Sequence, residues 1–166
     1  TQDATYRTTS RLVHLLVDIV SKNGCMLLNI APEASGIIPV QQQHALLEIG
    51  TWLEVNGEAI YGTRPWVVFG EGPPKAEGEA FFNPSEGFSN RDIRFTTNGD
   101  VLYAIVLGQP ESPIRIHSLL AEPILNIRLL GSDEQLEWRH DRDAIEIHPP
   151  STLPCEHAVT FRIQLQ

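Results

Sequence analysis

The fold is decided by residues 8–57, which read TTSRLVHLLVDIVSKNGCMLLNIAPEASGIIPVQQQHALLEIGTWLEVNG. Apolar residues in the first part of this stretch recur at helical spacing, which predicts a helix over residues 8–23. Thr9 or Ser10 suits the N-cap, because a short side-chain oxygen can accept from a free amide of the first turn. The helix is expected to end at Asn23-Gly24, a pair that tolerates the left-handed backbone of a helix terminus.

An apolar run and a second helix follow. Residues 25–30 are apolar without alternation and are closed by Ala31-Pro32, which is typical of a strand buried on both faces of a parallel sheet. Cys25 is accordingly expected to be a small buried core residue. Pro39 fits the first position of a helix whose apolar stripe runs to about Val55. The order helix–strand–helix is half of an α/β repeat.

The sequence after Trp66 loses the helical period and reads as a series of short strands. They recur at the spacing of roughly 8–12 residues that is typical of an antiparallel sandwich. Asn98-Gly99 predicts a tight hairpin turn, because this pair supplies the positive φ angles of a primed turn. Residues 70–90, rich in Gly and Pro, are expected to form a mobile loop. The expected strands are residues 66–69, 93–97, 101–107, 114–116, 124–130, 135–139, 144–147 and 159–165.

The fold class predicted from this order is an α/β remnant, residues 1–66, followed by an all-β antiparallel sandwich domain, residues 67–166. A complete (β/α)8 barrel takes about 250 residues, so residues 1–66 could supply only its last helices and strand. The chain opens at Thr1 almost directly with a helix pattern, so its N-terminus is expected to be a cut. With no barrel to cover their apolar faces, the helices are expected to be loosely ordered or to drive association, while the sandwich folds on its own.

Composition disfavours several classes of protein. With 12 Lys and Arg against 21 Asp and Glu, the net charge of −9 disfavours a nucleic-acid partner or an anionic membrane surface. No apolar run approaches the ~20 residues of a membrane span. The six histidines and two cysteines show no metal-ligand spacing, and the turn-like stretch His140-Asp141-Arg142-Asp143 is expected to be solvated. The sequence therefore predicts no metal and no cofactor.

Carboxylates are natural candidates for chemistry, but the sequence shows no catalytic pair. A pair that cleaves a glycosidic bond stands about 5–5.5 Å apart for retention or ~6.5–9.5 Å apart for inversion. Asn29 and Glu33 are the best-placed candidates for substrate contact, because loops after barrel strands build the mouth of a barrel. Each is also readily explained as a loop or capping residue. The carboxylates on or just after the helices are expected to be solvated: Asp18, Glu48, Glu54 and Glu58.

Aromatic side chains of a sandwich can stack on sugar rings. Trp66, Tyr103 and Trp138 occupy strand-like positions and are expected to be core residues. Phe81-Phe82 and Phe88 lie on the loose loop, where a binding surface could use them. A non-catalytic carbohydrate-binding domain and a purely structural β-domain therefore stay open as alternatives.

Five motifs follow one another in the first 66 residues: LVDIVSKNG (16–24), LLNIAP (27–32), GIIP (36–39), IGTWL (49–53) and NGEAIYGTRPW (56–66). Together they resemble a signature of the α-L-fucosidases of glycoside hydrolase family 29. The sandwich half is similar mainly in layout, with Phe95-Thr96 before the hairpin and a strand at residues 101–107. The sequence departs from the family at Cys25, where Asn is usual, and at Ala31, where Gly is usual.

The resemblance implies a catalytic (β/α)8-like barrel with a C-terminal β-sandwich, and removal of terminal α-linked L-fucose with retention of configuration. An Asp nucleophile and a carboxylic general acid/base would act through a covalent glycosyl-enzyme, without a metal. These groups lie upstream of the part that matches Thr1, so no catalytic residue is carried over and this chain alone is expected to be inactive. The implied partner is a fucosylated glycan or glycoconjugate. The full-length enzyme could be a homo-oligomer, and a periplasmic, secreted or lysosomal setting is expected.

Overall fold

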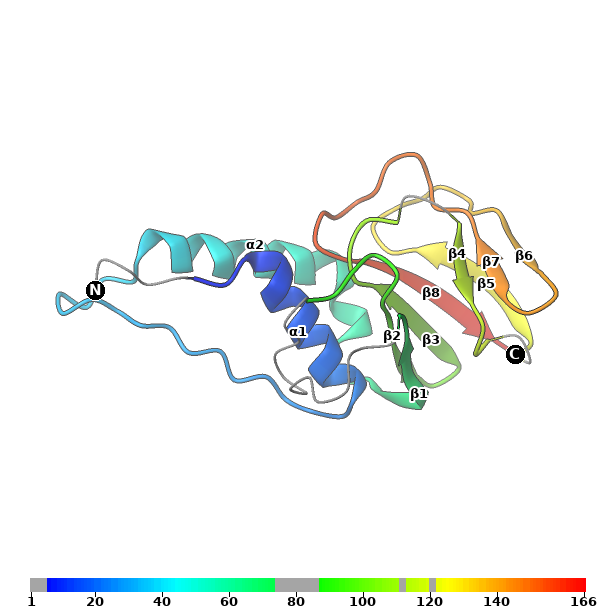
Figure 1. Ribbon diagram of the computed structural model, residues 1–166, viewed down its shortest axis with the longest axis horizontal. Helices are drawn as coiled ribbons and strands as arrows, with labels where there is room; N and C mark the ends of the chain where they lie inside the picture. Colours follow the sequence, from blue (N-terminus) through cyan, green and yellow to red (C-terminus); the bar gives the residue numbers. More distant parts are fainter. Residues whose placement is uncertain (1–5, 74–86, 111–112, 120–121) are drawn as a thin grey trace.

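A computed structural model describes residues 6–73, 87–110, 113–119 and 122–166, with two helices packed against a β-sandwich (Figure 1). Most of the mobile loop expected at residues 70–90 lies outside the described residues. Helix α1 spans Thr9–Ser21 and α2 spans Val40–Asn56, followed by a short 3-10 helix η1 at Gly57–Ala59. The strands are β1 (Arg64–Glu71), β2 (Ile93–Asn98), β3 (Val101–Val106), β4 (Ile114–Ile116), β5 (Ile124–Leu129), β6 (Trp138–His140), β7 (Ile145–Ile147) and β8 (Val159–Leu165).

The strands form two antiparallel sheets. The larger sheet has the order β1-β2-β3-β8-β5 and the smaller has the order β4-β7-β6. Each strand expected from the sequence has a counterpart, and the one expected at residues 135–139 is shorter and later, at Trp138–His140. The predicted antiparallel sandwich is confirmed.

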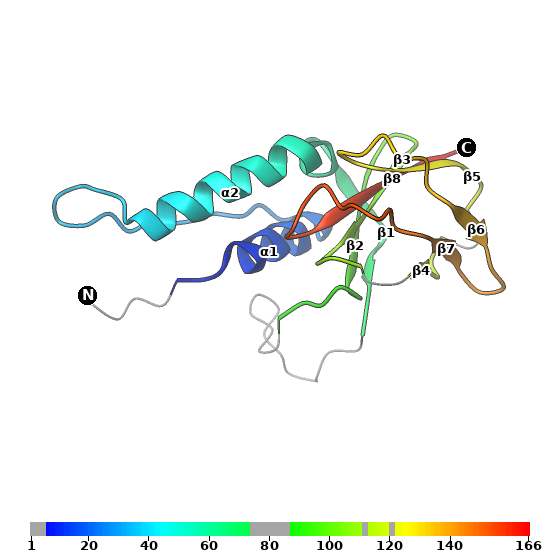
Figure 2. The same ribbon diagram turned by 90° about the horizontal axis from the view of Figure 1, so that it is seen from above.

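The central strands of the larger sheet, β2, β3 and β8, are largely buried on both faces. Phe95 and Phe161 point from one face into the core shared with the smaller sheet, and neither has exposed surface. From the other face, Ile105 packs in a second cluster with Val17 of α1 and Trp52 of α2. The molecule therefore has three layers, the small sheet, the large sheet and the helices (Figure 2).

Helix α1 begins and ends close to the predicted positions. Its N-cap is Thr8, one residue before the predicted caps, and the Thr8 hydroxyl accepts from the amide of Arg11 at 3.3 Å. At the other end Asn23 has a φ of 64°, and the amide of Gly24 donates to the carbonyl oxygen of Ile19 at 2.8 Å. This left-handed terminus confirms the predicted end of the helix.

The two helices are covered unequally. Val13 and Val17 of α1 have no exposed surface, because the large sheet covers them, so the expectation of an uncovered apolar face is wrong for α1. Helix α2 turns Trp52 inward, at 2% exposed, and leaves Leu47 72% exposed. Among the described residues, no helix combines the length and the apolar character needed to cross a membrane.

Residues 25–30 depart from the predicted strand. They are extended, pair with no described strand and are mostly exposed. Cys25 is exposed, so its predicted burial is wrong. The reason is physical: a strand of a parallel sheet needs neighbours to satisfy its backbone and cover its side chains, and the described part of the chain supplies none beside this segment.

The hairpin between β2 and β3 turns one position later than predicted. Asn98 and Val101 form the last strand pair, so Gly99 and Asp100 make the turn. Gly99 has a φ of 58°, whereas Asn98 and Asp100 are not among the residues with positive φ. A positive φ at the first turn position alone is typical of a type II′ turn.

Candidate functional site

The two candidate substrate contacts, Asn29 and Glu33, lie on the connection between α1 and α2. Both are exposed. Glu33 opens a tight loop in which its amide donates to the carbonyl oxygen of Ile37 at 2.9 Å and its carbonyl accepts from the amide of Gly36 at 2.8 Å. The φ of 83° at Gly36 allows this turn. Glu33 thus lies on a loop tip, and only Asn29 borders a hollow.

The hollow beside Asn29 is an open groove of about 340 Å³ between residues 6–12, residues 28–31 and the first half of α2. The side-chain amide of Gln42 pins its wall: the Ala31 amide donates to Gln42 Oε1 at 2.8 Å, and Gln42 Nε2 donates to the Ala31 carbonyl at 3.2 Å. The described lining is mainly apolar and contains no carboxylate, so the groove by itself holds no acid–base pair.

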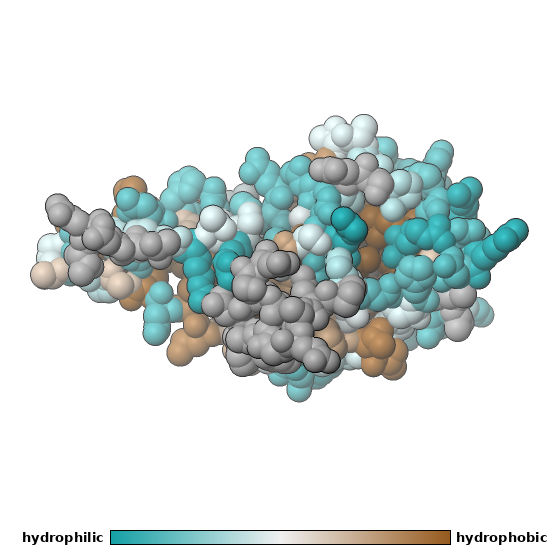
Figure 3. All heavy atoms as spheres, viewed as in Figure 1, coloured by the Kyte–Doolittle hydropathy of each residue, from teal (hydrophilic) through white to brown (hydrophobic). Residues whose placement is uncertain are grey.

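Apolar side chains are exposed around this groove. Leu28 is 38% exposed, Ile30 41% and Leu46 38%, and all three line the groove. Figure 3 shows apolar atoms, in brown, at this helical end of the molecule. Large apolar side chains gathered on one face are typical of a surface that another layer of protein covers.

The expectation that Asp18 is solvated is wrong. Asp18 is 2% exposed, and its Oδ1 accepts from Nε of Arg94 in β2 at 2.6 Å. Its Oδ2 accepts from Nζ of Lys22 at 2.8 Å. The polar face of α1 was expected to be solvated, but the large sheet packs against the part of it that carries Asp18. Arg94 was the sequence signal for a partner of Asp18. Ile93 and Phe95 on either side of it point into the sandwich core, so Arg94 had to point from the opposite face of the sheet, where α1 packs.

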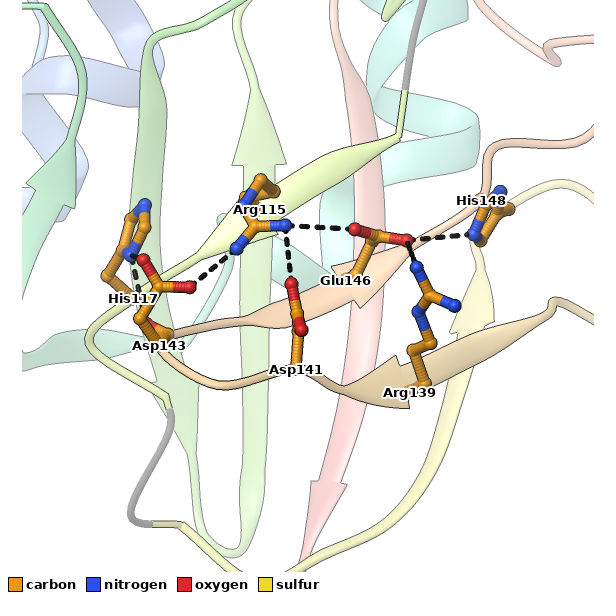
Figure 4. Close-up of polar contacts among 7 residues, drawn as sticks. All are labelled: Arg115, His117, Arg139, Asp141, Asp143, Glu146 and His148. Carbon is orange, nitrogen blue, oxygen red and sulfur yellow. Dashed lines mark hydrogen bonds and ion pairs between the residues drawn. The ribbon is translucent and has the colours of Figure 1, made fainter.

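The most extensive polar cluster lies on the outer face of the small sheet (Figure 4). Glu146 in β7 is paired across the strands with Arg115 and Arg139, and it accepts from Arg115 Nη1 at 3.0 Å and from Arg139 Nη2 at 2.7 Å. Asp141 accepts from the same Arg115 nitrogen at 2.7 Å. This hydrogen bond lowers the pKa of Asp141 and raises the pKa of Arg115. Asp143, His117 and His148 complete the cluster.

Each carboxylate of the cluster pairs with an arginine, which makes the cluster a cross-strand clamp rather than a ligand site. The stretch around Asp141, between β6 and β7, is a turn with largely exposed side chains, as predicted. No three His, Cys, Asp or Glu side chains of the described residues are placed to hold a metal ion.

The aromatic residues considered for sugar stacking are largely used in packing. Trp66 meets Phe95 edge to face, with ring centroids 5.3 Å apart, and Trp138 packs against the same core. Tyr103 is 4% exposed in the cluster beneath the helices. Phe88 is half-buried against Arg94, whereas Phe81-Phe82 lies outside the described residues.

Cys155 also serves packing. Its sulfur accepts from Nδ2 of Asn56 at 3.3 Å, and burial raises the pKa of the thiol. A thiol that stays protonated is a poor nucleophile. Cys25 and Cys155 are both free.

Comparison with protein families gives two matches in order along the chain. Residues 1–58 match the model of the α-L-fucosidase family, and residues 86–164 match that of the α-L-fucosidase C-terminal domain. The chain belongs to the α-L-fucosidase family.

Similar fucosidases are found among characterised proteins. The chain is 32% identical over 160 residues to human tissue α-L-fucosidase, covering 93% of this chain and 31% of that protein. It is 34% identical over 170 residues to rat plasma α-L-fucosidase, covering 95% and 33%. The chain therefore spans about a third of the length of the curated fucosidases that it matches.

Solved fucosidase structures share the fold. An α-L-fucosidase isoenzyme from Paenibacillus thiaminolyticus aligns over 100% of this chain and 36% of its own, with a TM-score of 0.76 and 29% identity. The Thermotoga maritima α-fucosidase in complex with a mechanism-based inhibitor aligns over 95% and 34%, with a TM-score of 0.76 and 31% identity. The arrangement of helices and sandwich in this chain is therefore that of the C-terminal third of these fucosidases.

Proposed function

We propose that this chain is the C-terminal part of a retaining exo-α-L-fucosidase that hydrolyses terminal α-linked L-fucose from glycans, with its catalytic carboxylates upstream of Thr1. The observation that carries the proposal is the unbroken likeness of the whole fold to the final third of fucosidases, the Thermotoga maritima enzyme with its mechanism-based inhibitor included. The absence of a carboxylate pair from the described groove is in keeping with this division of labour.

The proposal assigns a role to each half of the chain. Residues 1–66 complete the catalytic barrel, and the exposed apolar side chains of the groove, Leu28, Ile30 and Leu46, support a covering barrel layer there. Residues 67–166 buttress the barrel's end, a role that the shared cluster between the helices and the large sheet supports.

Asn29 and Glu33 are the proposed substrate contacts. Asn29 has the stronger support, because it borders the groove and lies two residues from Ala31. The side chain of Gln42 forms hydrogen bonds to both the amide and the carbonyl of Ala31. Glu33 is the outer contact, on the loop tip closed by Gly36. The proposed substrate is a fucosylated glycan or glycoconjugate.

The test is hydrolysis of para-nitrophenyl α-L-fucoside by a longer protein that carries the natural upstream sequence, with the 166-residue chain as the control. We expect turnover with the longer protein and none with the control. Turnover by neither would contradict the fucosidase proposal, and turnover by the control would contradict the upstream placement of the carboxylates.

A carbohydrate-binding role without catalysis has less support. A flat sugar platform needs an open sheet face with aromatic rings, but the helices and the small sheet cover both faces of the central strands of the large sheet. Binding of glycans by the 166-residue chain on an array would favour this role.

Self-association of the longer protein is part of the proposal, and light scattering measures it.

A further inference from the structure

We infer that Arg94 is a positioning residue for the proposed fucosidase site: it locks the end of α1 onto the large sheet and thereby fixes residues 25–31, which carry Asn29. The kinetic consequence rests on the proposed function. The geometry rests on the contacts of Arg94, Asp18 and the turn that follows α1.

The guanidinium of Arg94 uses its shape as well as its charge. The residue is 7% exposed, and its Nε donates to Asp18 at 2.6 Å while Nη1 donates to the carbonyl oxygens of Ile93 at 2.9 Å and Glu71 at 3.4 Å. Cζ of Arg94 also lies over the ring of Phe88, 5.0 Å from its centroid. A lysine ammonium cannot reproduce this combination of a planar fork and a stacked face.

Asp18 transmits this hold to the last turn of α1. A carboxylate that is 2% exposed needs charged partners, and it has them on the sheet in Arg94 and one helical turn later in Lys22. The carbonyl oxygen of Asp18 also accepts from the hydroxyl of Ser21 at 2.9 Å. The end of the helix is therefore tied to β2 at a defined point.

The direction in which the chain leaves α1 is equally defined. Gly24 folds back onto the helix so closely that a Cβ there would lie 2.7 Å from Cγ2 of Ile19. Asn29 follows five residues later, and Ala31 is anchored to α2 by Gln42. Asn29 is thus held between two anchors, and Arg94 secures the first of them.

The experiment compares variants of the longer, upstream-extended protein. Arg94→Met removes the guanidinium but keeps an apolar stem, and Arg94→Lys keeps only the charge. The matched control is Arg162→Met: Arg162 is on the neighbouring part of the same sheet, has a side chain 23% exposed, and pairs with Glu58 at 3.5 Å. The readouts are KM and kcat for the aryl fucoside, and the amide exchange of residues 22–24.

We expect Arg94→Met to raise KM roughly tenfold while kcat stays within about twofold, because a displaced binding residue weakens ground state and transition state alike. Arg94→Lys should raise KM less, and Arg162→Met should leave KM unchanged. The amides of residues 22–24 should exchange roughly tenfold faster in Arg94→Met, while those of β3 keep their protection. An unchanged KM with unchanged exchange in folded Arg94→Met or Arg94→Lys overturns the inference.

A double variant separates positioning from stability. Asp18→Leu combined with Arg94→Met replaces a buried ion pair by apolar contacts, which is expected to recover the unfolding midpoint. The inference expects KM to stay raised, and a KM that recovers together with the midpoint overturns it. If the unmodified longer protein does not hydrolyse the fucoside, the proposed function fails, and the exchange measurement alone decides the role of Arg94.

Discussion

The indole Nε1–H of Trp52 donates to the carbonyl oxygen of Ala158 at 2.9 Å, and this hydrogen bond joins α2 to the residue that precedes β8. Trp52 is 2% exposed and Ala158 is fully buried. The bond lies inside the cluster shared by the helices and the large sheet, where no solvent replaces a lost donor.

Trp52→Phe is expected to destabilise the 166-residue chain by about 1–3 kcal/mol, because it leaves the buried carbonyl of Ala158 without its donor. Urea unfolding followed by circular dichroism measures the change. Trp138→Phe is the control, since Trp138 is half-buried at the edge of the small sheet and should cost less. Equal midpoints for both variants would show that the hydrogen bond contributes little.

Two glycines should respond in opposite directions to alanine. At Gly24 a Cβ would meet Ile19 Cγ2 at 2.7 Å, so Gly24→Ala is expected to destabilise the chain by about 1–3 kcal/mol. At Gly50, in the middle of α2, a Cβ would meet no atom within 4 Å, so Gly50→Ala should stabilise it by about 0.5–1 kcal/mol. The same unfolding experiment measures both, and destabilisation by Gly50→Ala would contradict the open space around it.

Histidine 14 should make stability depend on pH. Burial lowers the pKa of His14 below its ordinary value of 6.5, and its Nε2 lies 2.8 Å from the carbonyl oxygen of His157. The unfolded chain therefore takes up a proton near that value while the folded chain does not. The free energy of unfolding should fall as pH drops through 6.5 and level off below the folded pKa.

The test is the urea midpoint measured between about pH 7.5 and pH 5, a range that spans the ordinary histidine pKa of about 6.5. The midpoint should decline more steeply for the parent chain than for His14→Gln, because the glutamine cannot take up the proton. His44→Gln serves as the control, because the His44 side chain is 74% exposed. Identical slopes for the parent and His14→Gln would refute the role of His14.

The hairpin turn predicts a contrast between neighbours. Gly99→Ala places a side chain at a φ of 58° and should cost about 1–2 kcal/mol. Asn98→Ala should stay within about 0.5 kcal/mol, because Asn98 is the last strand residue and occupies neither central position of the turn. Thermal melts of both variants measure the contrast, and a larger loss at Asn98 would favour the turn expected from the sequence.

Local patterns predicted most of this fold. Alternating residues such as Ile145 and Ile147 marked strands, and Pro39 marked the beginning of α2, because these signals depend on neighbours in the sequence. Residues 25–30 failed as a strand for the opposite reason, since their pairing partners are not among the described residues. The burial of Asp18 could not be predicted either, because Arg94 lies 76 positions away and only the packing of α1 on the sheet brings them together.

The candidate site was predicted less completely than the fold. Asn29 and Glu33 were predicted because they follow an expected barrel strand, and both lie on the same connection. The groove that Asn29 borders depends on Gln42, whose role no spacing rule suggests. Whether these two residues touch a sugar stays a prediction.

The burial of the central strands on both faces has a consequence for the design of a shorter protein from this chain. A protein that began at β1 would expose Tyr103, Ile105 and Leu107 to water. Exposing a large buried apolar side chain such as Ile105 or Leu107 costs about 1.5–3 kcal/mol of folding stability. The smallest unit that folds on its own is therefore expected to include α1 and α2 along with the strands, and not the sandwich alone.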